Sequence, residues 1–326
     1  MKSFLLVVGM LAGLVLTGAS AQATTADPTT LPRGDDAHLT WLGGLTLHPS
    51  TGPTMHVPLP RDHAATVKLL GPAAGGGWVL ADARGDRKVV LMLRGHRLTM
   101  VRSVSDPQDG TSFLLSSDGT HVVEVDAPTT RRTDVWTFDL AGRDRRHLRR
   151  PGYLTLLGYD GTTVHLTSSG RTIAWRPGSA PVVIARASGL AVDVPHDTLF
   201  TWDPGPGTYG PTALSAPGTQ TWSLPAGDFY PRKVSPDGAY VVGLGGHSND
   251  LQVRLMSDGS LVADWNRHLA FERPLLWENA GHVVSVLRTR RGRALLRCTV
   301  AADCVRTTRP SGDPVSLPFQ EVSFSS

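Results

Sequence analysis

The chain of 326 residues contains only two cysteines, and 6% of its residues are aromatic. It lacks a Gly-x-Ser-x-Gly elbow, a His-Glu-x-x-His pair and a Walker-type phosphate loop. These absences remove the sequence signatures of α/β-hydrolases, zinc peptidases and P-loop nucleotide hydrolases. From the sequence we therefore assign no catalytic residue, no metal ligand and no cofactor.

Helical periodicity is also missing. No segment keeps its apolar residues on a sustained 3.6-residue repeat, whereas glycine and proline are abundant at 35 and 24 residues. Both residue types interrupt helices and form turns. We expect an all-β chain in which helix is scarce.

A strand, a tight turn and a second strand recur along the chain. The clearest copy is VSPDGAYVVGL at residues 234–244. Glycine suits a two-residue hairpin turn because it adopts positive φ without strain, and Asp adopts it less readily. The turn residues are Gly76, Gly119, Gly161, Asp197, Gly238 and Gly281, spaced 36 to 43 residues apart.

Each turn is flanked by short runs rich in β-branched residues, and further runs follow. The third run of each unit lies at 89–93, 135–140, 172–176, 213–215, 253–256 and 294–299. A fourth is visible in several units, for example at 221–224 and 261–265. Four antiparallel strands repeated about every 40 residues are typical of the blades of a β-propeller.

The two ends of this region look like parts of one further blade. Residues 38–42, 45–47 and 55–59 resemble outer strands without an inner hairpin, and residues 315–324 resemble strands without outer partners. Sharing a blade between the two ends would leave no open sheet edge. We predict a single propeller, most simply of seven four-stranded blades, although six or eight also fit the pattern.

The N-terminus indicates export. Met1 and Lys2 precede an apolar run over 4–16, and an A-x-A pattern ends at Ala21. This is the organisation of a secretory signal peptide, and the run is shorter than a membrane-spanning helix requires. We predict a signal peptide over 1–21, a disordered spacer over 22–36, a propeller over 37–326, and no transmembrane span after cleavage.

The two cysteines, Cys298 and Cys304, are separated by five residues. In an exported protein, a single close pair is most simply a disulfide. We expect it to join the third and fourth strands of the last internal blade.

Arginine outnumbers lysine 28 to four, which indicates a GC-rich bacterial genome. Two clusters stand out, at 143–150 and 288–293, and we expect both on the blade rim. A solvated rim is one interpretation, and attraction to anionic envelope polymers or phospholipid is the other. Export and the lack of aromatic residues between the arginines disfavour nucleic-acid binding.

Two loops look long enough to shape a binding site. One is Asp203–Pro211, whose proline and glycine content excludes a strand and whose Tyr209 offers a stacking surface; the other is Gly243–Asp250. Both join second to third strands and should therefore share one face. Loops on a rigid scaffold often carry specificity. Our candidate binding residues are Asp203, Tyr209, His247, Asn249 and Asp250.

The Ser-Pro-Asp-Gly turn at 235–238 and its weaker copy at 116–119 resemble WD40-like and TolB-like β-propeller repeats. The terminal hairpin with Cys298 and Cys304 is similar to that of secreted actinobacterial WD40-type propellers without an assigned activity. The chain departs from the strict pattern, because Trp-Asp occurs only at Trp202-Asp203. The resemblance implies scaffolding or binding and supplies no catalytic residues.

Three functional classes stay open. The first is a monomeric, non-catalytic extracytoplasmic propeller that binds a protein or an envelope component. The second is a lactonase-like or glycosidase-like hydrolase, or a lyase, with a site at the mouth of the central channel, which would need several Asp, Glu or His side chains converging there. The third is a sensor of a small molecule or glycan. Fold alone does not separate them.

Overall fold

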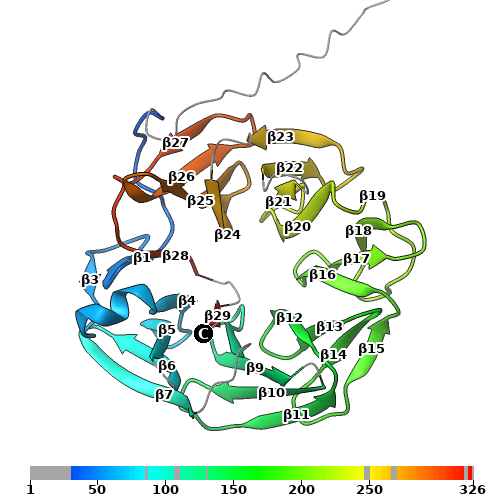
Figure 1. Ribbon diagram of the computed structural model, residues 1–326, viewed down its shortest axis with the longest axis horizontal. Coiled ribbons are helices and arrows are strands. Elements are labelled where there is room, and N and C mark those ends of the chain that lie inside the picture. The colour runs from blue at the N-terminus through cyan, green and yellow to red at the C-terminus, as the bar shows by residue number, and fades with distance from the viewer. Residues whose placement is uncertain are drawn as a thin grey trace, which may run out of the picture.

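Seven antiparallel sheets form a ring in the computed structural model, as Figure 1 shows. The structure describes residues 31–84, 87–105, 111–129, 131–245, 250–265, 270–318 and 322–324. The signal peptide predicted over 1–21 therefore lies outside the described residues. The one helical element among them is the 3₁₀ helix η1, Arg61–Ala65.

Six blades are built from consecutive strands, with the first strand of each innermost. Their bounds are, blade by blade: β4 Lys68–Pro72, β5 Trp78–Arg84, β6 Arg87–Arg94 and β7 Arg97–Ser105; β8 Thr111–Leu115, β9 His121–Thr129, β10 Arg132–Asp139 and β11 Arg146–Pro151; β12 Thr155–Tyr159, β13 Val164–Ser168, β14 Arg171–Trp175 and β15 Val182–Ala185; β16 Ser188–Asp193, β17 Thr198–Asp203, β18 Thr208–Ala213 and β19 Leu224–Pro225; β20 Phe229–Val234, β21 Tyr240–Gly245, β22 Leu251–Leu255 and β23 Leu261–Trp265; β24 Ala270–Asn279, β25 His282–Thr289, β26 Gly292–Thr299 and β27 Cys304–Arg306. The prediction of an all-β propeller with seven four-stranded blades is confirmed.

The recurring turns lie between the first and second strands, as predicted. Gly238 has a φ of 74°, and Asp197, which replaces glycine in its unit, has a φ of 48°. A Cβ at Gly238 would also come within 2.7 Å of the His196 ring. Both the backbone conformation and the close neighbour therefore require glycine at this turn.

The seventh blade joins the two ends of the chain. Its strands β1 (Trp41–Gly43), β2 (Thr46–His48) and β3 (Met55–His56) are completed on the inner side by β28 (Val315–Ser316). The Ser316 hydroxyl also accepts a hydrogen bond from the Leu69 N–H in β4 of the next blade, at 2.9 Å. One blade is thus shared by the two ends, as expected.

The last strand does not belong to the shared blade. Residues 322–324 form β29, which pairs antiparallel with β8 and adds a fifth, innermost strand to the β8–β11 sheet. Two residues of the predicted C-terminal strand region are enough to close the shared blade, because β1 is only three residues long. Strand β29 lies beside β8, near the centre of the ring (Figure 1).

The expectation of a long loop over Asp203–Pro211 was wrong. Strand β18 begins at Thr208 and includes Pro211, opposite Phe200 of β17. The Pro211 carbonyl points to the outer side of β18. There it accepts a hydrogen bond from the Thr221 N–H, which is not part of the short outer strand β19. Since N–H and C=O of a strand residue point to the same side, the N–H that proline lacks would also lie where no ladder bond is needed.

The hydrophobic core lies between neighbouring blades. One cluster, for example, packs Val242 and Val253 of one blade against Leu275, Val283 and Leu296 of the next. This is the expected outcome when both faces of each sheet are apolar and every sheet has two neighbours. Within the described ranges, no helix is long and apolar enough to cross a membrane.

Residues 22–30 of the predicted spacer lie outside the described residues, whereas residues 31–34 contact the propeller. Leu31 is buried in the core, and its carbonyl accepts a hydrogen bond from Arg306 Nε of β27 at 2.9 Å. Arg33 forms a parallel bridge with Arg306, and the Gly34 N–H donates to the Arg306 carbonyl. The start of the described chain therefore covers the outer edge of the β24–β27 blade.

A buried polar network ties η1 to its blade. His63 of η1 is buried and hydrogen-bonds through Nδ1 to Asp82 of β5. The other Asp82 oxygen accepts a hydrogen bond from the Thr66 hydroxyl at 2.6 Å. Burial of these polar groups is tolerated because each has a partner.

Candidate ligand-binding site

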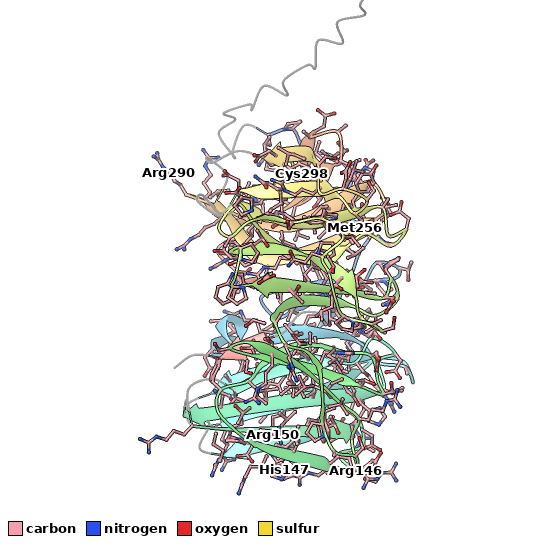
Figure 2. All side chains as sticks on the ribbon, turned by 90° about the vertical axis from the view of Figure 1, so that its right-hand side faces the viewer. Arg146, His147, Arg150, Met256, Arg290 and Cys298 are labelled. Atoms are coloured by element: carbon pink, nitrogen blue, oxygen red, sulfur yellow. A yellow bond between two sulfur atoms is a disulfide. The ribbon has the colours of Figure 1, made fainter. Side chains whose placement is uncertain are left out.

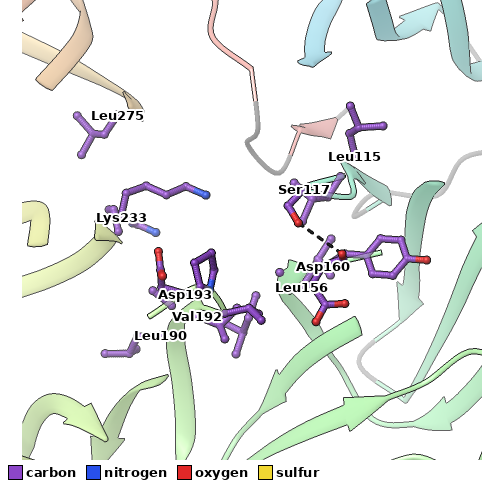
Figure 3. A pocket seen from close by; sticks show the side chains of 17 residues that line it. Leu115, Ser117, Leu156, Asp160, Leu190, Val192, Asp193, Lys233 and Leu275 are labelled. Atoms are coloured by element: carbon purple, nitrogen blue, oxygen red, sulfur yellow. Dashed lines mark hydrogen bonds between the residues drawn. The ribbon is translucent and has the colours of Figure 1, made fainter. Parts of the chain in front are cut away.

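A cavity of about 550 Å³ lies at the centre of the ring (Figure 3). Its walls come from the first strands of five consecutive blades: β8, β12, β16, β20 and β24. Exposed residues on its rim include Ser117, Pro195 and Arg232. It is therefore open to solvent at the end of the blades that carries the turns between first and second strands.

The cavity wall combines apolar side chains and polar groups in roughly equal parts. Its apolar side chains are Leu114, Leu115, Leu156, Leu157, Leu190, Ala191, Val192, Val194 and Leu275. Leu157, Leu190, Val192 and Val194 remain partly exposed. An apolar concave surface with a few polar groups is typical of a ligand pocket.

Lys233 lies in the wall of this cavity, and its ammonium group points into the cavity (Figure 3). Strand β20 holds it in place, because Val234 is buried on one side and the Lys233 carbonyl accepts a hydrogen bond from Trp277 Nε1 at 3.0 Å. Removal from water lowers the pKa of the Lys233 ammonium, and the nearby Asp193 carboxylate only partly offsets this effect. The group is thus a cation that gains from an anionic partner.

Two carboxylates lie in the cavity wall, and both are held by local hydrogen bonds. Asp193 Oδ1 pairs with His196 Nδ1 at 2.7 Å and accepts a bond from the His196 N–H. Asp160 Oδ1 accepts bonds from the N–H groups of Thr162 and Thr163, at 2.7 and 2.6 Å. Burial opposes ionisation of Asp160, but these donors outweigh it and lower its pKa. Both carboxylates therefore have structural partners of their own.

The structure does not bring the predicted site residues into this cavity. Asp203 ends β17, Tyr209 lies in β18, and Asp250 precedes β22 with a buried side chain. They belong to connections between second and third strands, which in an antiparallel blade lie at the end opposite the cavity mouth. His247 and Asn249 lie outside the described residues.

Tyr209 does have an aromatic neighbour from the next blade. Its ring lies 5.4 Å from that of Tyr230, centroid to centroid, in β20. Burial and a hydrogen bond with Tyr230 raise the pKa of the Tyr209 hydroxyl. The two rings form a contact between blades.

Sequence analysis missed Lys233 as a site residue, although one signal was available. Lys233 lies two residues before Ser235 of the Ser-Pro-Asp-Gly turn, in the run assigned to the first strand of its blade. First strands line the central channel of a propeller, so a charged residue in that run is a candidate to face the channel. What the sequence could not supply was the set of apolar side chains that four other blades place around it.

Both arginine clusters lie on hairpins and outer strands, as expected. Figure 2 shows Arg146, His147 and Arg150 at one edge of the molecule and Arg290 projecting from another region. Cys298 and Cys304 are joined by a disulfide that links β26 to β27. Among the described residues, no group of three or more His, Cys, Asp or Glu side chains could hold a metal ion.

Comparison with known proteins identifies the fold. No protein-family model matches the chain, and no curated protein matches it by sequence. Solved structures do match.

The Cps50 (Swd1) β-propeller domain of Myceliophteria thermophila is 12% identical with a TM-score of 0.53, covering 74% of this chain and 85% of that one. A chain of the Mitotic Checkpoint Complex is 12% identical with a TM-score of 0.54, covering 74% and 79%. A functionally unknown protein from Desulfotomaculum acetoxidans DSM 771 is 12% identical with a TM-score of 0.51, covering 87% and 98%. At such identities the likeness concerns the fold alone, and the chain has a WD40-like β-propeller fold.

Proposed function

We propose that this chain is a non-catalytic, extracytoplasmic β-propeller that binds a protein or another cell-envelope component through the cavity at its centre. The observation that carries the proposal is the cavity itself: an opening of about 550 Å³ whose wall combines apolar side chains with polar groups and is built by five blades. A rigid ring holds such a wall in its binding shape before the partner arrives, which reduces the entropic cost of binding.

Two further features support the compartment and the mode of action. The signal-peptide pattern over 1–21 and the Cys298–Cys304 disulfide both suit an exported protein. One structural neighbour is a chain of the Mitotic Checkpoint Complex, so this fold does occur inside a protein assembly. We propose a secreted bacterial protein, similar to actinobacterial WD40-like or TolB-like propellers, that is a monomer until it meets its partner.

A binding role suits the cavity better than a hydrolase or lyase role. The two carboxylates of its wall, Asp160 and Asp193, are each engaged by neighbours in their own turns. A general acid or base must be able to approach the reacting atom and exchange its proton. Asp160 and Asp193 instead stabilise the turns that shape the cavity mouth.

Site-directed photo-cross-linking in the native cell envelope tests the proposal. A photoreactive residue replaces Ser117 at the cavity rim in one variant and Asp203, at the opposite end of the blades, in the other. We expect one saturable adduct from position 117 and none from position 203.

The adduct should disappear when Leu190→Glu places a charge in the cavity wall, and it should persist in Leu261→Glu. Leu261 is a matched control, because it is 50% exposed on the outer strand β23 and distant from the cavity wall. Equal capture from both positions, or capture unaffected by Leu190→Glu, would contradict binding at the cavity.

A further inference from the structure

The central cavity combines one inward-pointing ammonium with a wall that is partly apolar. The Lys233 side chain emerges from β20 and reaches into the space between the inner strands (Figure 3). Leu275 of β24, Leu190 and Val192 of β16, and Leu156 of β12 surround that space. An ammonium in such surroundings has given up part of its hydration, and a fitting anion would compensate for that loss.

The charges around Lys233 limit the kind of anion that fits. Arg232 adds a second cation at the rim, while Asp193 and Asp160 add two negative charges to the same wall. Any anion in the cavity would meet the same two carboxylates, but their repulsion is about twice as large for a phosphate dianion as for a singly charged group. A carboxylate is the common biological anion that carries one charge and can end an apolar chain.

We infer that this cavity binds a carboxylate carried on an apolar chain, with Lys233 pairing with the carboxylate and the leucine and valine side chains covering the apolar part. The inference rests on the proposed binding role of the cavity and adds the chemistry of its ligand. The carboxylate could come from a small acid or from the C-terminus of a partner protein.

The partly buried position of Lys233 agrees with this geometry. The cavity wall lowers the pKa of its ammonium, and a bound carboxylate would raise that pKa again and favour the charged form. Ligand binding should therefore also make the Lys233 amine less reactive toward acylating reagents.

Calorimetric titration of the purified full chain with matched probes tests the inference. The small-molecule probes are octanoate, octanamide and octylamine, and the peptide probes are an apolar peptide ending in leucine with either a free or an amidated C-terminus. We expect the acids to bind and each amide to bind about tenfold more weakly, because it lacks the charge-assisted hydrogen bond. Whether octanoate or the peptide with a free C-terminus binds more tightly identifies the source of the carboxylate.

Lys233→Met keeps an apolar side chain of similar length and removes the charge. We expect it to lose about tenfold in affinity for the acids while leaving the amides unchanged. Lys68→Met is the matched control, because Lys68 lies on the inner strand β4 outside the cavity wall and donates to the Ala65 carbonyl. Its affinities should equal those of the unmodified protein.

A second readout uses the unmodified chain and is independent of how the variants fold. Mild acylation followed by peptide mass spectrometry reports the reactivity of each lysine. A saturating concentration of octanoate, or of the peptide with a free C-terminus, should protect Lys233 from acylation and leave Lys68 as reactive as before.

Equal binding of acid and amide, preference for octylamine, absence of binding by every acid, or an unprotected Lys233 would each overturn the inference. The proposed function is judged separately, by whether the adduct from position 117 depends on the cavity wall. A partner that is captured there but does not protect Lys233 would leave the binding role standing and exclude the carboxylate.

Discussion

Single residues of the repeated turn have identifiable structural duties. In the Ser-Pro-Asp-Gly turn, the buried Ser235 hydroxyl donates to Asp237 Oδ1 at 2.6 Å and accepts from the Tyr240 N–H at 2.9 Å. Ser116 and Asp118 repeat the arrangement in another blade, also at 2.6 Å. The motif thus satisfies backbone groups of its hairpin, and its carboxylate accepts a hydrogen bond from the Ala239 N–H.

We predict that Ser235→Ala lowers the free energy of unfolding by about 1–2 kcal/mol, since it leaves the Tyr240 N–H without its acceptor. Ser116→Ala should have a similar effect, because its hydroxyl accepts from the His121 N–H. Chemical denaturation measures both. Ser117→Ala is the control: Ser117 is exposed, and its replacement should change stability by less than about 0.5 kcal/mol. Equal effects for Ser235 and Ser117 would show that the motif serine is not structural.

The same turns make stability depend on pH. The Ser235 hydroxyl, followed by the Ala239 N–H, lowers the pKa of Asp237 below its ordinary value of 3.8. The unfolded chain therefore binds the proton more readily, so this contribution to stability is complete above about pH 3.8 and is lost as the pH falls through the folded pKa.

Asp237→Asn removes that titration. We expect the stability difference between the unmodified protein and the variant to be larger at pH 6 than at pH 2.5, as measured by urea denaturation at both values. A stability difference that does not change with pH would show that these hydrogen bonds do not lower the pKa of Asp237 in the folded protein.

At the scale of elements, the first arginine cluster is partly a packing device. Arg145 lies over the Trp136 ring of β10, 5.0 Å from its centroid, and His147 of β11 stacks on the same ring at 3.8 Å. Arg149 Nε pairs with Asp134 at 2.8 Å. The sequence contains no aromatic residue between these arginines, but strand pairing brings Trp136 beside them. Several charges of the cluster thus stabilise the β10–β11 pair.

The disulfide acts on a single hairpin. Cys298 and Cys304 are directly paired residues of β26 and β27, and β27 also binds the segment from Leu31 to Gly34. We predict that replacing both cysteines with alanine lowers the free energy of unfolding by about 2 kcal/mol, the value expected for closing so short a loop.

Addition of a reductant should lower the unfolding midpoint of the unmodified protein and leave that of the double variant unchanged. Free thiol in oxidised protein, detected by alkylation and mass spectrometry, would contradict the pairing. A midpoint insensitive to reductant would show that the bond contributes no stability.

For the whole molecule, ring closure depends on two short pairings. β28 completes the shared blade through Ser316 and Val315, whereas β29 adds three residue pairs to β8. Removal of β28 leaves the inner edge of β1 unpaired, while removal of β29 leaves every blade with four strands.

We therefore predict that a chain ending at residue 318 unfolds at a slightly lower temperature than the full chain, and that a chain ending at residue 312 is destabilised much more. Calorimetry compares the two truncations, and amide exchange should show lost protection in β1 for the shorter chain only. Equal destabilisation would mean that β28 is not the closing strand.

The sequence by itself determined the repeat. Glycine and aspartate at turns about 40 residues apart, together with β-branched runs of strand length, specify hairpins locally. The propeller and its shared closing blade therefore followed from the residues, with seven blades as the simplest of three possible counts. The Cys298–Cys304 pairing was equally local, because five intervening residues fit one hairpin. Local pattern failed at Pro211, where strand formation depended on which neighbour its backbone faced.

Tertiary structure alone decided the candidate site. The cavity exists because five inner strands, distant in sequence, present leucine and valine side chains to one space around Lys233. It also placed Asp203 and Tyr209 at the opposite end of the blades and directed β29 onto β8. The physical reason is that hairpin geometry depends on a few adjacent residues, whereas a channel wall depends on how the sheets pack around their common axis.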